Sequence, residues 1–267
     1  MFSFIKRIDL AKFCLLCFGL NVLILNASNN KQENLDIYVC IGQSNMAGRA
    51  VLPPELTDTL DNVFLLNSDG VFEKAVNPLN RYSNIRKDIS MQRLSPAYEF
   101  GITISRLTKS DVGLVVNARG GSSINSWIKG SKDGYYEKTL SRIREAMKYG
   151  VVKAILWHQG ETDCASSDKY MAKLQKLITD LRTDLGMENL PVVVGQISRW
   201  DGWTKRPEGT KAFNEMITTV PDFIPNSGFV TSEGIKPYKD EFDPHFDTGG
   251  QLLLGKRYAY KVIDLLK

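Results

Sequence analysis

Residues 37–45, which read IYVCIGQSN, decide the fold class of this chain. The apolar run from Ile37 to Ile41 is short and partly β-branched and follows a polar stretch, which favours a buried strand of a parallel sheet over a helix. Ligands of open α/β sheets bind at the carboxyl ends of strands, where loops leave the sheet. Ser44 therefore lies where α/β enzymes carry out chemistry, although serine and asparagine are also common residues of ordinary turns.

Strand-like and helix-like segments alternate along the rest of the chain. We expect further strands at 112–117, 152–157 and 191–197, and helices at 97–108, 135–149, 169–185, 208–220 and 249–266. Residues 48–94 show little periodicity, and we expect a long excursion over the sheet there. The alternation predicts an α/β fold with a mostly parallel sheet that helices cover on both faces.

The first 27 residues differ from the remainder in composition. Lys6 and Arg7 precede an apolar stretch, residues 13–25, which ends near the small residue Ala27, and this pattern is typical of a secretory signal. We expect residues 1–27 to be a signal peptide and residues 28–267 to form one domain. The protein is then secreted or periplasmic, without stable membrane insertion after removal of the signal. A retained membrane anchor is the alternative.

Charge and cysteine content exclude several classes of function. The net charge is +4, from 34 basic and 30 acidic residues spread along the chain, so no basic stripe predicts a nucleic-acid partner. Beyond the signal the sequence has two cysteines, Cys40 and Cys164, which are too few for a disulfide framework but leave one bridge open. Residues 28–267 contain no CxxC pair or histidine cluster, so we expect no metal site there, and we expect no cofactor.

A nucleophilic serine needs a base within hydrogen-bond reach, usually histidine. The sequence offers only His158 and His245. His158 follows the predicted strand 152–157 directly. His245 lies in a loop before the last predicted helix, and such a loop can carry an imidazole over the strand ends, where an acid just before it can orient the ring. This arrangement favours His245 as the base for Ser44.

Acyl transfer also needs hydrogen-bond donors that face the developing oxyanion. Three candidates follow three predicted strands: the backbone N–H of Ser44, a backbone N–H of Gly120-Gly121, and the side-chain amide of Gln159. Paired glycines allow the backbone to approach a substrate closely, although taken alone they also read as a tight turn. The occurrence of all three donors at predicted strand ends favours a catalytic role for them.

Four blocks resemble those of the SGNH (GDSL-like) hydrolases, in the form found in the sialate O-acetylesterase and acetylxylan esterase branch of the carbohydrate esterases. The blocks are Gly42-Gln43-Ser44-Asn45-Met46, Gly120-Gly121-Ser122-Ser123-Ile124 with Trp127, His158-Gln159-Gly160-Glu161-Thr162-Asp163, and His245-Phe246-Asp247 followed by Gly255-Lys256-Arg257-Tyr258-Ala259. They occur in the family's order between about residues 36 and 260.

The resemblance implies a flavodoxin-like three-layer α/β/α sandwich and metal-independent hydrolysis. It implies Ser44 as nucleophile, His245 as base, His158 as a structural residue, and an oxyanion hole formed by Ser44, Gly121 and Gln159. The family's acid commonly stands three residues before the histidine, where this chain has Phe242. We assign the role to Asp243, which is nearer to His245 in sequence, and Asp240 is the alternative.

These residues predict a serine esterase that removes O-acetyl groups from a carbohydrate, such as acetylated xylan, sialic acid or a related glycan, through an acyl-enzyme. Two alternatives stay open. A lipase-like or thioesterase-like acyl hydrolase of the same fold would have a long apolar pocket. A non-catalytic sugar-binding protein on this fold would bind sugar without turnover. The sequence selects neither the acetylated sugar nor the oligomeric state.

Overall fold

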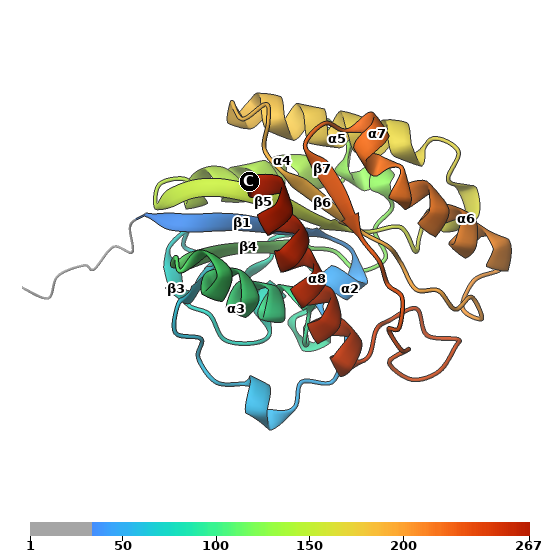
Figure 1. Cartoon of the computed structure of the whole chain (residues 1–267), viewed down its shortest axis with the longest axis horizontal. Helices are drawn as coiled ribbons and strands as arrows, with labels where there is room; N and C mark the ends of the chain where they lie inside the picture. Colours follow the sequence, from blue (N-terminus) through green and yellow to red (C-terminus); the bar gives the residue numbers. More distant parts are fainter. Residues whose placement is uncertain (1–33) are drawn as a thin grey trace, which may run out of the picture. The chain divides into compact units, whose positions relative to one another are not determined.

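A seven-stranded sheet forms the centre of residues 34–267, the part of the chain that the computed structural model describes (Figure 1). The strands are β1 (Leu35–Gly42), β2 (Val63–Leu66), β3 (Phe72–Lys74), β4 (Val112–Ala118), β5 (Gly150–His158), β6 (Val192–Gly195) and β7 (Ser227–Val230). Their order is β3-β2-β4-β1-β5-β6-β7, and all neighbouring pairs are parallel except β2 with β3. The predicted mostly parallel sheet is confirmed.

The central strand β1 contributes side chains to two hydrophobic cores, one on each face of the sheet. Ile37, Val39 and Ile41 belong to one core, and the alternating Tyr38 and Cys40 belong to the other. All five are fully buried. A strand that is covered on both faces reads as a continuous apolar run, which is the pattern seen in the sequence.

Helices cover both faces of the sheet and complete a three-layer sandwich (Figure 1). One core includes buried residues of α4 (Tyr135–Ala146), α5 (Tyr170–Leu185), α6 (Pro207–Thr218) and α7 (Val220–Phe223), and the other includes α3 (Pro96–Thr108) and α8 (Thr248–Leu266). Short helical turns are α2 (Ser44–Ala47), Pro54–Leu56, Leu79–Tyr82, Ile89–Met91, Ile124–Trp127 and Cys164–Ser166.

The structure differs from the expected strands at the two edges of the sheet. Residues 48–94 are not only an excursion, because β2 and β3 within them extend the sheet beyond β4. β7, which has the sequence SGFV, was not expected at all and forms the opposite edge. β3 (FEK) and β7 (SGFV) contain polar residues or glycine, and the apolar run of β2 (VFLL) has only four residues, so none of them establishes a clear strand pattern.

The N-terminal and cysteine predictions have different outcomes. The expected signal peptide lies outside the described residues. Within residues 34–267, no helix is long and apolar enough to cross a membrane. Cys40 and Cys164 are both buried and free, so the bridge left open by the sequence is not formed.

The sheet order brings the predicted functional segments to one edge. β4 and β5 pair with β1 on its two sides, so the loops that follow β1, β4 and β5 leave the sheet next to one another. Because parallel strands end at the same edge of a sheet, this is the place where α/β folds hold ligands. The three predicted strand ends therefore meet.

Candidate active site

Ser44 is the first residue of the short helix α2, directly beyond the end of β1. The strand ends at Gly42, whose φ of 137° is rare for other residues and whose α-carbon faces β5 so closely that a Cβ would lie 2.0 Å from the His158 carbonyl oxygen. Gln43 N–H then donates to that carbonyl at 2.8 Å. Ser44 is 6% exposed, so this turn presents it at the edge of the sheet with little solvent contact.

The glycine block follows β4 and lies against the serine turn. Arg119 N–H donates to the Gly42 carbonyl at 2.9 Å, and a Cβ on Gly120 would lie 3.5 Å from the Ser44 Cβ. Gly121 has a φ of 71°, in the left-handed region that favours glycine. Among residues 34–267, neither Ser44 N–H nor Gly121 N–H donates to another protein group. Two backbone donors, one in the serine turn and one in the adjoining glycine block, are therefore free.

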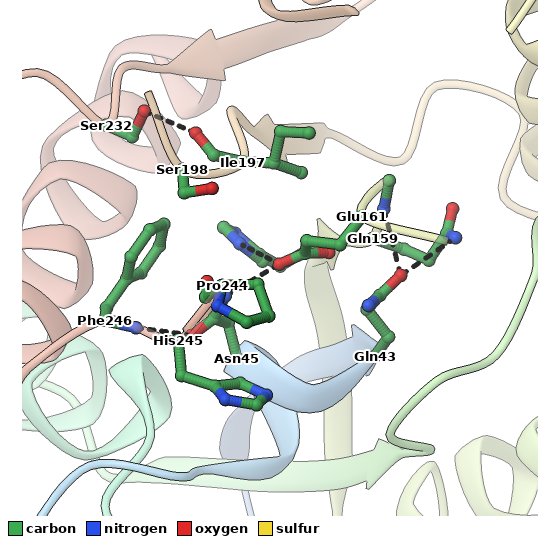
Figure 2. A network of polar contacts seen from close by, with 12 residues as sticks. Gln43, Asn45, Gln159, Glu161, Ile197, Ser198, Ser232, Pro244, His245 and Phe246 are labelled. Carbon is green, nitrogen blue, oxygen red and sulfur yellow. Dashed lines mark hydrogen bonds and ion pairs between the residues drawn. The ribbon is translucent and has the colours of Figure 1, made fainter. Parts of the chain in front are cut away.

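Gln159 connects the three loops from a fully buried position (Figure 2). Its Nε2 contacts three acceptors: Gln43 Oε1 at 3.1 Å, the Ser122 carbonyl at 3.0 Å and Asp163 Oδ2 at 2.5 Å. An amide nitrogen has two hydrogens, so protein acceptors take up both of them in this structure. Gln159 lies beside the glycine block, as the sequence predicts, but it holds the loops together and presents no free N–H.

Asp163 fixes the glycine block to the loop after β5. Its two carboxylate oxygens accept hydrogen bonds from Ser123 Oγ at 2.7 Å and from Ile124 N–H at 2.9 Å. The Gln43 side chain makes a similar link, because its Oε1 also accepts from Gly160 N–H at 3.2 Å. These contacts join the edge of the sheet into one connected polar network.

His245 is oriented by Asp243. Asp243 Oδ1 contacts His245 Nδ1 at 2.6 Å and also accepts the His245 backbone N–H at 3.0 Å. Trp200 Nε1 donates to the Asp243 carbonyl at 2.7 Å and so holds the same loop from the β6 side. The carboxylate of Asp240, the alternative acid, instead accepts Phe242 N–H at 2.9 Å and forms the preceding turn.

The pKa of His245 is lowered from its usual value. Burial, which disfavours the imidazolium, is the largest cause, and the positive charges of Arg49 and Lys239 act in the same direction. The charge and hydrogen bond of Asp243 oppose this shift without reversing it. His245 is therefore a neutral imidazole near pH 7, with Nδ1 held by Asp243 and Nε2 left to accept a proton.

Asn45 links the serine turn to the histidine loop (Figure 2). Its Oδ1 accepts Phe246 N–H at 3.0 Å, and its Nδ2 donates to the Pro244 carbonyl at 3.2 Å and to Glu161 Oε1 at 2.7 Å. Pro244 and Phe246 flank His245 in the chain. Asn45, which follows Ser44, therefore holds the backbone on both sides of His245 close to the serine turn. Among the described residues, Ser44 Oγ and His245 form no hydrogen bond with each other, which is common for catalytic pairs without substrate.

His158 lies in the core of the protein and does not reach the serine. It is fully buried, its Nδ1 lies 3.1 Å from the Tyr258 hydroxyl, and burial lowers its pKa to about 3. Glu161 Oε1 lies 3.9 Å from His158 Nε2. Burial raises the pKa of Glu161 to about 7, although the hydrogen bond from Asn45 acts in the opposite direction. Both groups lie buried beneath the serine turn.

Sequence reasoning placed Ser44, Gly121, Gln159, Asp243 and His245 at one edge of the sheet, and the structure brings them together there. It did not find the linking roles of Gln43, Asn45 and Trp200. The only local signal was the position of two amide side chains on either side of Ser44, because amides both donate and accept.

Comparison with known proteins agrees with this geometry. The family profile of carbohydrate esterases described as sialic acid-specific acetylesterases matches residues 34–264. The chain belongs to this family. The esterase is 31% identical over 245 residues to a probable carbohydrate esterase of Arabidopsis thaliana, covering 84% of this chain and 88% of the plant protein. It is thus a carboxylic ester hydrolase of the carbohydrate esterase class.

Solved structures share the fold of this esterase. The crystal structure of the Arabidopsis thaliana protein superposes with a TM-score of 0.74 at 25% identity, covering 87% of this chain and 99% of that one. NanS gives 0.65 at 14% identity, covering 88% and 98%. A carbohydrate acetylesterase from Xanthomonas citri gives 0.61 at 18% identity, covering 86% of this chain and 56% of that one. The last two support the fold alone.

Proposed function

We propose that this carbohydrate esterase removes O-acetyl groups from an acetylated glycan by a serine mechanism. One observation carries the proposal: Asn45, next to Ser44 in the chain, hydrogen-bonds both residues that flank His245, and His245 is held by Asp243 at 2.6 Å. A nucleophile, a base and an orienting acid are thereby supplied by two loops that are tied together. This is the arrangement that an activated serine needs.

In the first proposed step, Ser44 Oγ attacks the acetyl carbonyl carbon while His245 Nε2 takes the hydroxyl proton. Asp243 keeps the proton on Nδ1 and stabilises the imidazolium that forms. The tetrahedral intermediate then collapses, and His245 gives its proton to the departing sugar oxygen. Water attacks the acetyl-serine while His245 takes a proton from it; the bond from the acetyl carbon to Ser44 Oγ then breaks, His245 returns the proton to Oγ, and acetate leaves. The lowered pKa of His245 suits this role, because the neutral base predominates near pH 7.

The free N–H groups of Ser44 and Gly121 are the proposed main donors to the oxyanion. Gln159 is the third residue of the proposed oxyanion hole. Its Nε2 must release one of its three protein acceptors before it can donate to the oxyanion. We therefore propose that Gln159 contributes least of the three residues to stabilising the oxyanion, and that it holds Ser122 in place. The proposed substrate is an acetylated carbohydrate, and the proposed location is secreted or periplasmic.

Acetate release tests the proposal directly. Wild type, Ser44→Ala and the control Ser68→Ala, which changes an exposed turn serine, would be assayed on 4-nitrophenyl acetate and on a panel of acetylated xylan, sialic acid and other glycans. We expect the control to match wild type and Ser44→Ala to lose at least about 10³-fold in rate. Equal rates for wild type and Ser44→Ala would remove Ser44 from the mechanism.

A further inference from the structure

Arg49 lies at the oxyanion side of the site and is not part of the proposed triad or donor set. Its Nη1 donates to the Gly48 carbonyl at 2.7 Å and to the Met91 carbonyl at 2.8 Å, which fixes the plane of the guanidinium. Its Nη2 lies over Gly120, 2.5 Å from the point where a Cβ would be. The Ser44 Cβ lies 3.5 Å from that same point. The guanidinium and the Ser44 side chain therefore approach the same face of Gly120.

The charge of Arg49 has no anionic partner in the described part of the chain. No carboxylate of residues 34–267 forms an ion pair with it, and Nη2 donates to no protein acceptor there. Its charged neighbour is another cation, Arg93, whose repulsion adds to the effect of burial in lowering the pKa of Arg49. A half-buried cation held beside a second cation is unfavourable unless an anion arrives during function.

A second cation lies at the neighbouring glycine. Lys87 Nζ is 3.4 Å from the point where a Cβ on Gly121 would be. The glycine block is thus approached from outside by two side-chain cations, and a side chain on Gly120 would displace Arg49. Because Gly120 has no side chain, the Arg49 guanidinium has room on the face of Gly120 that the Ser44 side chain also approaches.

We propose that Arg49 is a further catalytic residue, whose Nη2 donates to the acetyl carbonyl oxygen as negative charge develops on it. The inference rests on the proposed serine mechanism. In the step concerned, the bond from Ser44 Oγ to the carbonyl carbon forms, the carbonyl π electrons move to oxygen, and the serine proton goes to His245. Arg49 stays protonated throughout and forms no covalent bond. Its fixed charge adds to the two backbone donors.

Arg49 also has a structural role, which the experiment must distinguish from a catalytic one. Nη1 ties Gly48 to Met91 and so holds the loop, but this bond does not involve Nη2. The charge also faces His245, whose other charged neighbours are Asp243 and Lys239 of its own loop. Removing Arg49 should therefore raise the pKa of His245, because a repelling cation is lost. This shift reports only that the Arg49 charge lies near His245, so kcat and the Gly120 variant below must separate catalysis from the structural role.

The experiment compares Arg49→Met, Arg49→Lys and the control Arg93→Met on the neutral substrate 4-nitrophenyl acetate. For Arg49→Met we expect kcat to fall on the order of 10²-fold with little change in KM, and the acid limb of the pH profile to move to higher pH. Arg49→Lys should recover part of kcat, and Arg93→Met should match wild type. A wild-type kcat in Arg49→Met on this neutral substrate would overturn the proposal.

A second variant controls for disruption of the loop that Arg49 Nη1 holds. Gly120→Ala keeps the Arg49 residue but puts a methyl group 2.5 Å from the position of Nη2, which must then move away, and Gly120 is not among the residues with positive φ. We expect Gly120→Ala to lower kcat alone but to have much less effect in the Arg49→Met background, because both changes remove one interaction. Additive effects would contradict the proposal. If Ser44→Ala were fully active, the serine mechanism would fail first, whatever the Arg49 variants show.

Discussion

The side-chain oxygen of Asn45 accepts the backbone N–H of Phe246 at 3.0 Å, across 201 positions of the sequence. With the bond from its Nδ2 to the Pro244 carbonyl, it fixes the backbone on both sides of His245. Asn45 is fully buried, so these bonds are protected from competition with water. The relative position of the proposed nucleophile and base thus depends on a side chain with no chemical role of its own.

Asn45→Ala should separate His245 from Ser44 and leave several buried groups without partners. We expect kcat/KM to fall about 10²-fold, since small misplacements of reacting groups cost that much, and the free energy of unfolding to fall by roughly 2 to 4 kcal/mol. Esterase rates and urea unfolding measure the two effects. Asn214→Ala is the matched control, because that buried amide ties Ile197 and Ser198 in the same way without contacting the histidine loop. Equal losses of rate in both variants would contradict this role of Asn45.

Asp243→Asn keeps a side chain of the same shape but removes the charge beside His245. We expect kcat to fall between about 10²-fold and 10⁴-fold, because the imidazolium loses its partner and the imidazole its fixed orientation. Asp243 raises the pKa of His245. Its removal therefore lowers that pKa further, and the acid limb of kcat/KM moves to lower pH. The pH dependence of kcat/KM on 4-nitrophenyl acetate measures both changes.

Asp240→Asn is the internal comparison for this assignment. Asp240 caps the turn at Phe242 and does not contact His245, so we expect a rate within a few-fold of wild type and an unmoved acid limb. A large loss in Asp240→Asn, with little loss in Asp243→Asn, would transfer the orienting role to Asp240.

Glu161→Gln should make stability less sensitive to pH. Burial raises the pKa of Glu161 to about 7 from 4.5, so the folded protein keeps this proton to higher pH than the unfolded chain. The resulting stability is full below about pH 4.5 and is lost as pH rises through about 7. Relative to wild type, the glutamine variant should gain up to about 3 kcal/mol between about pH 5 and 8. Urea unfolding at several pH values measures this difference, and a difference that does not change with pH would count against the raised pKa.

The parts of the fold that were predictable are those whose apolar runs are covered on both faces. β1, β4 and β5 read as strands because every residue from Val112 to Ala118, and most of the other two strands, is buried. β2 and β3 at one edge and β7 at the other escaped prediction. Each is three or four residues long, and such runs do not establish a period.

The candidate site likewise contains residues that the sequence predicts and contacts that it does not. Ser44, Gly121 and Gln159 follow strands, so a parallel sheet places them together without further information. The contacts made by Asn45, Gln43 and Trp200 join residues 43 to 201 positions apart, and no local pattern encodes such pairs. The free state of Cys40 and Cys164 was likewise beyond the sequence, which showed two thiols but not their distance.

The most direct test of the account is the identity of the residue that a serine-directed reagent modifies. The esterase would be treated with diethyl 4-nitrophenyl phosphate, and the modified peptide would be located by mass spectrometry while activity is followed. We predict one diethylphosphoryl group on Ser44, formed in parallel with inactivation and absent from Ser44→Ala. Full inactivation with the label on another residue would contradict the assignment of Ser44 as the nucleophile.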